Sequence, residues 1–110
     1  MANLTPKLLY IGSGTASNVY TTSNSSGSYT IVKNINICNT TANSVSVDVN
    51  ILSAAGTPGS NNALLKSLTV QAFETISYDT SVVLDAGYKI YTVNASNNCT
   101  FTISGVEYSA

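Results

Sequence analysis

SVSVDVNIL, residues 44–52, is the clearest indication of a β fold, because polar and apolar side chains alternate along it from residue 44 to residue 51. A period of two places successive side chains on opposite faces of an extended chain. The segment is therefore predicted to be a β-strand with one buried face. Its β-branched residues also favour a strand. The predicted inward set is Val45, Val47, Val49 and Ile51.

The segment upstream, YTIVKNINICN at residues 29–39, has the same character, with Lys33 as an exception on its apolar face. Turn-forming Asn, Thr and Ser residues lie between the two segments at 39–44. We therefore expect the two segments to form an antiparallel hairpin with one wall in the core. The apolar face predicted for the upstream segment consists of Ile31, Ile35 and Ile37.

A second hairpin is predicted at the end of the chain, where residues 88–95 and 99–108 flank the turn formers Ser96, Asn97 and Asn98. Gly105 interrupts the last strand and is predicted to mark a bulge. Cys99, Phe101 and Ile103 share the inward face before the bulge, and Val106 and Tyr108 are expected to take that face over after it.

Between the two hairpins, residues 63–70 and 74–84 are further strand candidates. Leu64, Leu65 and Leu68 are also spaced as on a helix, so a helical turn is an alternative for the first of these segments. Short strands are predicted at 7–11 and 16–22, followed by a polar loop at 23–28.

The chain is long enough for one domain and too short for two. Residues 29–110 are predicted to form the sandwich core, and residues 1–28 either edge strands or an arm that reaches a neighbouring subunit. Seven or eight strands with frequent turns predict an all-β, antiparallel β-sandwich of jelly-roll or immunoglobulin-like Greek-key type.

The composition leaves little material for catalysis. Among 110 residues there are four lysines, five acidic residues, no Arg, no His and no Trp, and the net charge is −1. Without His, Ser–His and Cys–His pairs are impossible within one chain, and a zinc site lacks its usual ligands. Four lysines without Arg argue against nucleic-acid binding. We therefore predict a protein that is not an enzyme and has no cofactor or metal.

Ser, Thr and Asn fill roughly two positions in five, so the surface is expected to be polar but poor in charge. Such a surface repels identical neighbours weakly and suits a molecule packed beside many others. A secreted domain with few charges is the alternative. The N-terminal segment contains only a four-residue apolar run at 8–11, which predicts neither an export signal nor a membrane span. We expect cytoplasmic synthesis, with Cys38 and Cys99 as reduced thiols and a disulfide between them as the alternative.

Tyrosines are the candidate interface residues, because a tyrosine ring offers a large contact area at a low cost in side-chain entropy. Packing at the rim of the core is the alternative role. Tyr88 and Tyr91 lie three apart in one predicted strand, so they are expected on opposite faces. The candidate interface set is Tyr10, Tyr20, Tyr88, Tyr91 and Tyr108.

Three segments, IVKNINICN (31–39), LDAGYKIY (84–91) and TISGVE (102–107), give the chain from residue 28 onward a resemblance to a class of small virion proteins of tailed bacteriophages. The resemblance implies a β-sandwich that forms homo-oligomers on the virion, as a capsid decoration or cement protein or as a neck or tail accessory. Its partners would be copies of itself and other virion proteins. A carbohydrate-binding or host-adhesion module that holds glycans with exposed Tyr and Asn is the alternative function.

Overall fold

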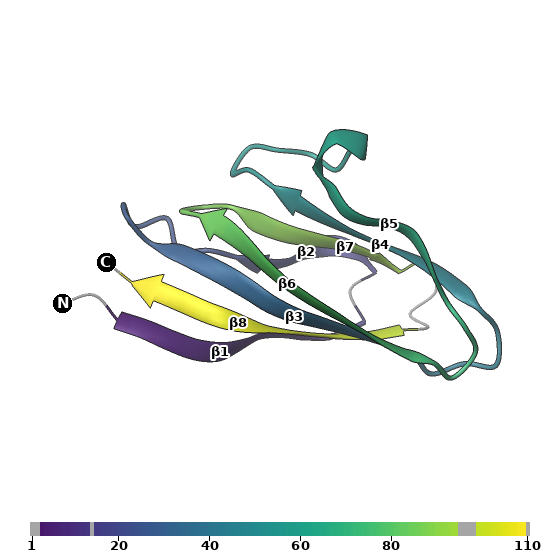
Figure 1. Cartoon of the computed structure of the whole chain (residues 1–110). Helices are drawn as coiled ribbons and strands as arrows, with labels where there is room; N and C mark the ends of the chain where they lie inside the picture. The colour runs from purple at the N-terminus through teal and green to yellow at the C-terminus, as the bar shows by residue number, and fades with distance from the viewer. Residues whose placement is uncertain (1–2, 14, 95–98, 110) are drawn as a thin grey trace.

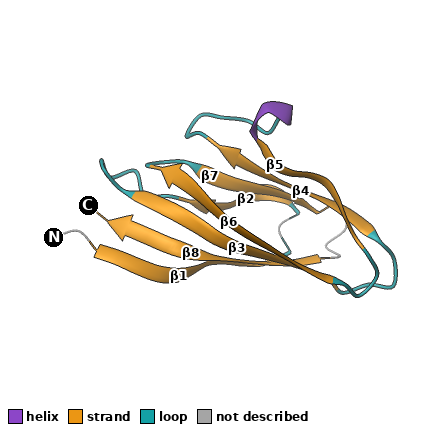
Figure 2. Ribbon diagram, in the orientation of Figure 1, coloured by secondary structure: helices purple, strands orange, loops and turns teal. Residues whose placement is uncertain are grey.

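Two four-stranded antiparallel sheets pack face to face in a computed structural model of the chain, which describes residues 3–13, 15–94 and 99–109. One short 3-10 turn, Ser60–Asn62, precedes β5 (Figure 2). The predicted all-β sandwich is confirmed. The strands are β1 (Asn3–Gly12), β2 (Ala16–Thr21), β3 (Tyr29–Asn39), β4 (Val45–Leu52), β5 (Ala63–Val70), β6 (Thr75–Asp85), β7 (Lys89–Asn94) and β8 (Cys99–Ser109).

The first sheet has the strand order β1-β8-β3-β6 and the second sheet the order β2-β7-β4-β5 (Figure 1). Only β4 and β5 are neighbours both in the sequence and in a sheet. In every other pair of consecutive strands, the two strands belong to different sheets. The edge strands β1 and β2 pair with β8 and β7 of the same chain, which makes β1 part of the first sheet and β2 part of the second.

The two predicted hairpins are wrong, although their strands exist. β3 and β8 belong to the first sheet, whereas β4 and β7 belong to the second, so neither β3 and β4 nor β7 and β8 pair. The physical reason is that alternation shows which face of a strand is apolar but does not show with which strand it pairs. Here β3 and β4 contribute to the same core from opposite sheets, and so do β7 and β8. The predicted turn at Ser96–Asn98 lies outside the described residues.

The core lies between the sheets and is made of aliphatic side chains around one Phe. The predicted inward residues of β4 and the first half of β8 are confirmed: Val45 and Ile51 pack against this core, and the others are buried in it. The fully buried members are Val32, Ile35, Ile37, Val47, Val49, Val70, Leu84, Ile90, Cys99, Phe101 and Ile103.

A bulge at Lys33 reverses the faces of β3. Val32 pairs with Gly105 and Asn34 with Ser104, so Lys33 is one residue more than β8 has at this point. Ile35 and Ile37 are buried as predicted, but Val32 and Thr30 occupy the inward face before the bulge. The prediction that Ile31 shares the inward face is therefore wrong, because one inserted residue inverts every side chain on one side of it.

Gly105 of β8 lies opposite this bulge, and the side chains of β8 keep their alternation between inner and outer face on both sides of it. A Cβ built on Gly105 would lie 2.1 Å from the Ile31 carbonyl oxygen, so glycine is needed for the close approach of β3. Glu107 pairs with inward-facing Thr30, whereas Val106 and Tyr108 pair with Ile31 and Tyr29 on the outer face. The predicted inward position of Val106 and Tyr108 is wrong because the bulge belongs to β3.

Residues 63–70 form strand β5, so the helical alternative is wrong. The helix-like spacing of its leucines results from bulges in this strand. Val47 pairs with Leu68 and Val49 with Leu65, which leaves Lys66 and Ser67 opposite Asp48. Ser67 adopts φ 50°, and its N–H donates to Asp48 Oδ1 at 2.6 Å. Lys66 Nζ forms an ion pair with Asp48 Oδ2 at 3.4 Å.

Buried asparagines fasten the segments that leave the sheets. Asn39 Nδ2 donates to the carbonyl oxygens of Val70 and Asn43, which ties the end of β3 to the second sheet. Asn94 Nδ2 donates to the carbonyl oxygens of Ser13 and Cys99. Part of the polar composition therefore serves the interior, where a buried amide must find partners.

Candidate functional site

The outer surface of the first sheet carries apolar side chains near the N-termini of β1 and β3. The register aligns two cross-strand rows there, Leu4–Tyr108–Tyr29–Asp85 and Pro6–Val106–Ile31–Val83. Within these rows only Asp85 is charged. We call the apolar members of both rows, together with Leu8 in the next row, the apolar outer face: Leu4, Pro6, Leu8, Tyr29, Ile31, Val83, Val106 and Tyr108.

Three aliphatic side chains protrude most from the apolar outer face. Leu4 is 61% exposed, Leu8 52% and Val83 55%. Isolated exposed apolar residues are ordinary, but a contiguous group is characteristic of an interaction surface. The rings of Tyr29 and Tyr108 stack at the centre with centroids 4.7 Å apart and planes 11° apart. Stacked rings hold each other upright, so they give the face a rigid middle.

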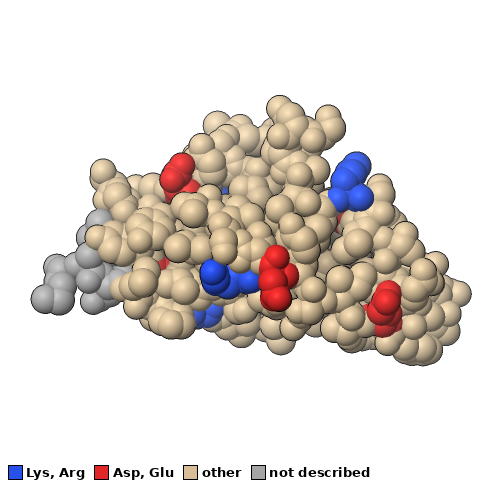
Figure 3. All heavy atoms as spheres, in the orientation of Figure 1, with Lys and Arg blue, Asp and Glu red and all other residues tan. Residues whose placement is uncertain are grey.

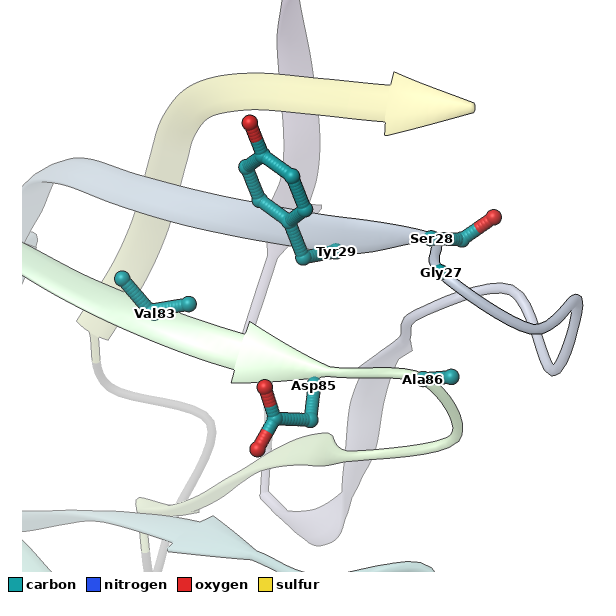
Figure 4. A pocket seen from close by; sticks show the side chains of 6 residues that line it. All are labelled: Gly27, Ser28, Tyr29, Val83, Asp85 and Ala86. Atoms are coloured by element: carbon teal, nitrogen blue, oxygen red, sulfur yellow. The ribbon is translucent and has the colours of Figure 1, made fainter. Parts of the chain in front are cut away.

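A hollow of about 400 Å³ opens at the β6 side of the apolar outer face. The Tyr29 ring and the Asp85 carboxylate point away from one another, and Val83 lies beside them on β6 (Figure 4). The turn residues Gly27, Ser28 and Ala86 complete the lining. The hollow can accept an apolar group against Tyr29 and Val83, with one carboxylate at its margin.

The outer surface of the second sheet differs in composition. Its cross-strand positions include Asn18 beside Tyr91, Thr21 beside Lys89, and Ser46 beside Thr69. Asp48 and Lys66 add an ion pair there. The charged side chains visible in Figure 3 are few and scattered over a largely uncharged surface. The two sheets therefore present unlike outer surfaces, one apolar at one end and the other polar.

A polar cluster joins the two sheets behind the apolar outer face. Tyr20 of β2 donates its hydroxyl proton to Glu107 of β8, and the same hydroxyl lies 2.9 Å from Thr30 Oγ1. Lys7 Nζ donates to the other carboxylate oxygen of Glu107 at 3.1 Å. Thr22 Oγ1 donates to Thr30 Oγ1 at 3.1 Å. Both carboxylate oxygens are thus engaged, and the cluster links β1, β2, β3 and β8.

The protonation states in this cluster follow from its contacts. Burial and the hydrogen bond to Glu107 raise the pKa of Tyr20 to about 12. The hydrogen bond from Tyr20 and the nearby Lys7 ammonium lower the pKa of the Glu107 carboxyl, although burial opposes this shift. At neutral pH Tyr20 is therefore a donor and Glu107 an ionised acceptor. This is the arrangement of a structural link between sheets.

The five predicted interface tyrosines do not form one surface. Tyr10, Tyr20 and Tyr88 pack against the core, while Tyr91 pairs with Asn18 and Asn50 on the outer surface of the second sheet. Tyr88 and Tyr91 thus lie on opposite faces, as expected. Tyr108 alone belongs to the apolar outer face, where it stacks on Tyr29.

The aliphatic members of the apolar outer face were not predicted from the sequence. Leu4, Pro6 and Leu8 alternate with Thr5 and Lys7, so a period-two apolar wall was visible in residues 4–8. Alternation identifies such a wall but does not tell the core side from the solvent side. The sequence predicts Ile31 on the core side, because the bulge at Lys33 has no marker in the sequence.

The two cysteines are free thiols. Cys99 lies in the core, whereas Cys38 follows inward-facing Ile37 and lies on the opposite wall of its strand. Burial raises the pKa of the Cys99 thiol, which favours the unreactive protonated form.

Among residues 3–13, 15–94 and 99–109, no three His, Cys, Asp or Glu side chains gather closely enough to bind a metal ion. The same part of the chain contains no helix with the length and hydropathy needed to cross a bilayer. The chain matches no protein-family model, no curated protein sequence and no solved structure.

Proposed function

We propose that this chain is a structural protein of a tailed-bacteriophage virion, either a capsid decoration or cement subunit or a neck or tail accessory, and that it acts by protein–protein assembly. The observation that supports this proposal most is the apolar outer face on an otherwise charge-poor sandwich. A contiguous exposed apolar patch is often a functional contact surface. The resemblance of residues 28–110 to small virion proteins supplies the class of assembly.

Within the sandwich class, we propose a jelly-roll topology. The pairs β1–β8, β2–β7, β3–β6 and β4–β5 are nested, as in one long antiparallel hairpin closed at the β4–β5 end. The additional pairs β3–β8 and β4–β7 form when that hairpin is rolled up into two sheets. Jelly rolls of this kind recur in viral capsid and lectin domains. The fold alone therefore fits both the virion role and its alternative.

The charge distribution is consistent with assembly. Virion subunits sit at fixed short distances from one another, so repulsion between copies must be small. A net charge of −1 on 110 residues keeps that repulsion low. Specificity then comes from shape and apolar contact, and long-range steering contributes little.

The proposal is tested on virus particles produced with and without the gene for this chain. We expect mass spectrometry to find the chain in purified wild-type particles at a fixed ratio to the major capsid or tail protein. Cryo-electron microscopy should show a sandwich-shaped density at repeated positions that is missing from the deletion particles. Purified wild-type particles that lack the chain would refute the proposal.

A carbohydrate-binding or host-adhesion module is the second candidate, and the hollow beside Tyr29 favours it. Sugar sites combine an aromatic ring with a hydrogen-bonding carboxylate, and Tyr29 and Asp85 provide both at the margin of one concave surface. This function predicts saturable binding on a glycan array that is lost in Asp85→Ala. Wild-type protein that binds no glycan on such an array would exclude this candidate.

A further inference from the structure

We propose that the apolar outer face binds a second copy of this chain. The resulting homodimer has a two-fold axis parallel to the strands, and Leu4 of each copy enters the hollow beside Tyr29 of the other. This inference rests on the proposed assembly function and names its first contact surface and partner.

The shape of the apolar outer face supports a second copy as the occupant. Leu4 protrudes at the β1 edge of the sheet, and the hollow lined by Tyr29 and Val83 opens at the β6 edge. A two-fold axis that lies in the interface along the strands superposes β1 of one copy on β6 of the other. The face thus offers both halves of a self-complementary contact, which is what a two-fold interface requires.

The strand register places Leu4 and the hollow at the same position along the strand direction. Leu4 belongs to the row that continues through Tyr108 and Tyr29 to Asp85. Rotation about an axis parallel to the strands exchanges the two ends of a row without shifting it along the strands. Leu4 of one copy therefore meets the Tyr29–Asp85 end of the same row in the other. Pro6 meets Val83 in the same way, because they end the neighbouring row.

The size of the face fits a reversible dimer. Four strands about 4.8 Å apart are about 19 Å wide, and the eight residues from Leu4 to Ile11 span about 23 Å. Ile11 is exposed and pairs with Thr102. The projected area of this part of the sheet, which includes the more polar rows beyond the apolar outer face, is therefore roughly 400 Å² per copy, and protruding side chains raise the area that contact would bury. This is at the low end for specific interfaces, so we expect dissociation constants in the micromolar range, about 1–100 μM.

The two apolar rows contain one charged residue, and the exposed Lys33 and Asp79 lie beside these rows on β3 and β6. That one charged residue is Asp85, which lies at the margin of the hollow with its carboxylate directed away from Tyr29 (Figure 4). The outer surface of the second sheet carries Lys89 and the Asp48–Lys66 pair, which would lose hydration in a similar contact.

Sedimentation velocity of the purified full-length chain over a concentration range tests the proposal. The mass should rise from 11.4 kDa toward twice that value. Leu4→Glu should weaken association at least about tenfold, because it inserts a carboxylate into an apolar hollow beside Asp85 of the other copy. Leu4→Lys should weaken it less, because the ammonium lies near that same Asp85. Thr69→Glu, an exposed position on the second sheet, is the matched control and should leave association unchanged.

A cysteine pair tests the orientation. Positions 6 and 83 end the same row on opposite edge strands of one sheet, about 14 Å apart, so Pro6→Cys and Val83→Cys cannot form a disulfide within one chain. Mild oxidation of the double variant should give a covalent dimer, and each single variant should not. Circular dichroism of every variant confirms that it is folded.

Wild-type protein that stays monomeric throughout, or association that Leu4→Glu and Thr69→Glu weaken equally, would overturn the dimer. So would a double cysteine variant that forms no more covalent dimer than the single variants. If wild-type chains stay monomeric but Leu4→Glu is absent from particles, the face binds another virion protein. In that case this inference fails while the proposed function stands. A dimer in solution from a chain that is absent from particles would be the reverse outcome.

Discussion

Replacing Gly105 by alanine would insert a single methyl group between β8 and β3. The ideal Cβ at this position lies 2.1 Å from the Ile31 carbonyl oxygen, 3.1 Å from the Ile31 carbonyl carbon and 3.1 Å from Val32 Cα. All three atoms belong to the backbone, so no side chain can rotate away. The two strands must separate for the residue to fit.

The cost follows from this separation. A carbon–oxygen contact needs about 3.2 Å or more, so the strands must move apart locally by about 1 Å, against hydrogen-bonded ladders on both sides of β8. Overpacking of a buried position costs about 1–3 kcal/mol. Weakening one or two ladder hydrogen bonds adds about 0.5–1.5 kcal/mol each. We expect Gly105→Ala to lower the free energy of unfolding by about 2–4 kcal/mol and Tm by roughly 10–25 °C.

The assay is urea unfolding followed by far-ultraviolet circular dichroism, with calorimetry for Tm. Gly59→Ala is the matched control, because Gly59 is exposed with extended backbone angles, and its added Cβ meets only the Asn61 side chain at 3.3 Å. The control should change the free energy of unfolding by less than about 0.5 kcal/mol. A Gly105→Ala protein as stable as the Gly59→Ala protein would refute the close approach of β3 and β8.

Glu107→Gln should reduce the loss of stability in acid. The pKa of the Glu107 carboxyl is lowered from its ordinary value of 4.5, so its ionised form stabilises the fold above pH 4.5, and this contribution disappears as the pH falls through the folded-state pKa. Unfolding curves between pH 2 and 7 would record the difference. Tyr20→Phe should remove a loss at the alkaline end, because a pKa raised from 10.0 to about 12 gives stability below pH 10 that disappears as the pH rises through 12; a wild-type curve that stays flat there would contradict this role. Asp48→Ala should cost about 1–2 kcal/mol in urea unfolding, since the Ser67 N–H loses a charged acceptor. Ser67→Gly should gain up to about 1 kcal/mol, because φ 50° strains a side-chain-bearing residue; a loss of stability would show that the bulge is not strained.

The positions of most strands could be predicted from the sequence. The segment predicted at 63–70 coincides with β5, and the one at 74–84 differs from β6 by one residue at each end. The alternation that gave these bounds is a local property of extended chain. The inward residues of β4 could be predicted for the same reason, since its bulged partner β5 leaves the faces of β4 itself unchanged.

Pairing partners could not be predicted in the same way. Short polar segments after β3 and after β7 suggested hairpins, yet β3 and β4 lie in different sheets, and so do β7 and β8. A short loop is compatible with either outcome. The choice depends on contacts with strands far away in the sequence, such as β8 with β1 and β3.

Side-chain alternation and composition are local quantities, so the amino-acid sequence alone predicts an all-β sandwich whose surface has little charge. The apolar outer face depends instead on how distant strands pair. Ile31 faces outward because the bulge at Lys33 inverts the first half of β3 against β8 and Gly105. The leucines of β1 face outward because β1 pairs with β8 in a register that puts Leu4 beside Tyr108. A period of two defines two walls on every strand, and only pairing with distant strands decides which wall meets the core and which is free to bind a partner.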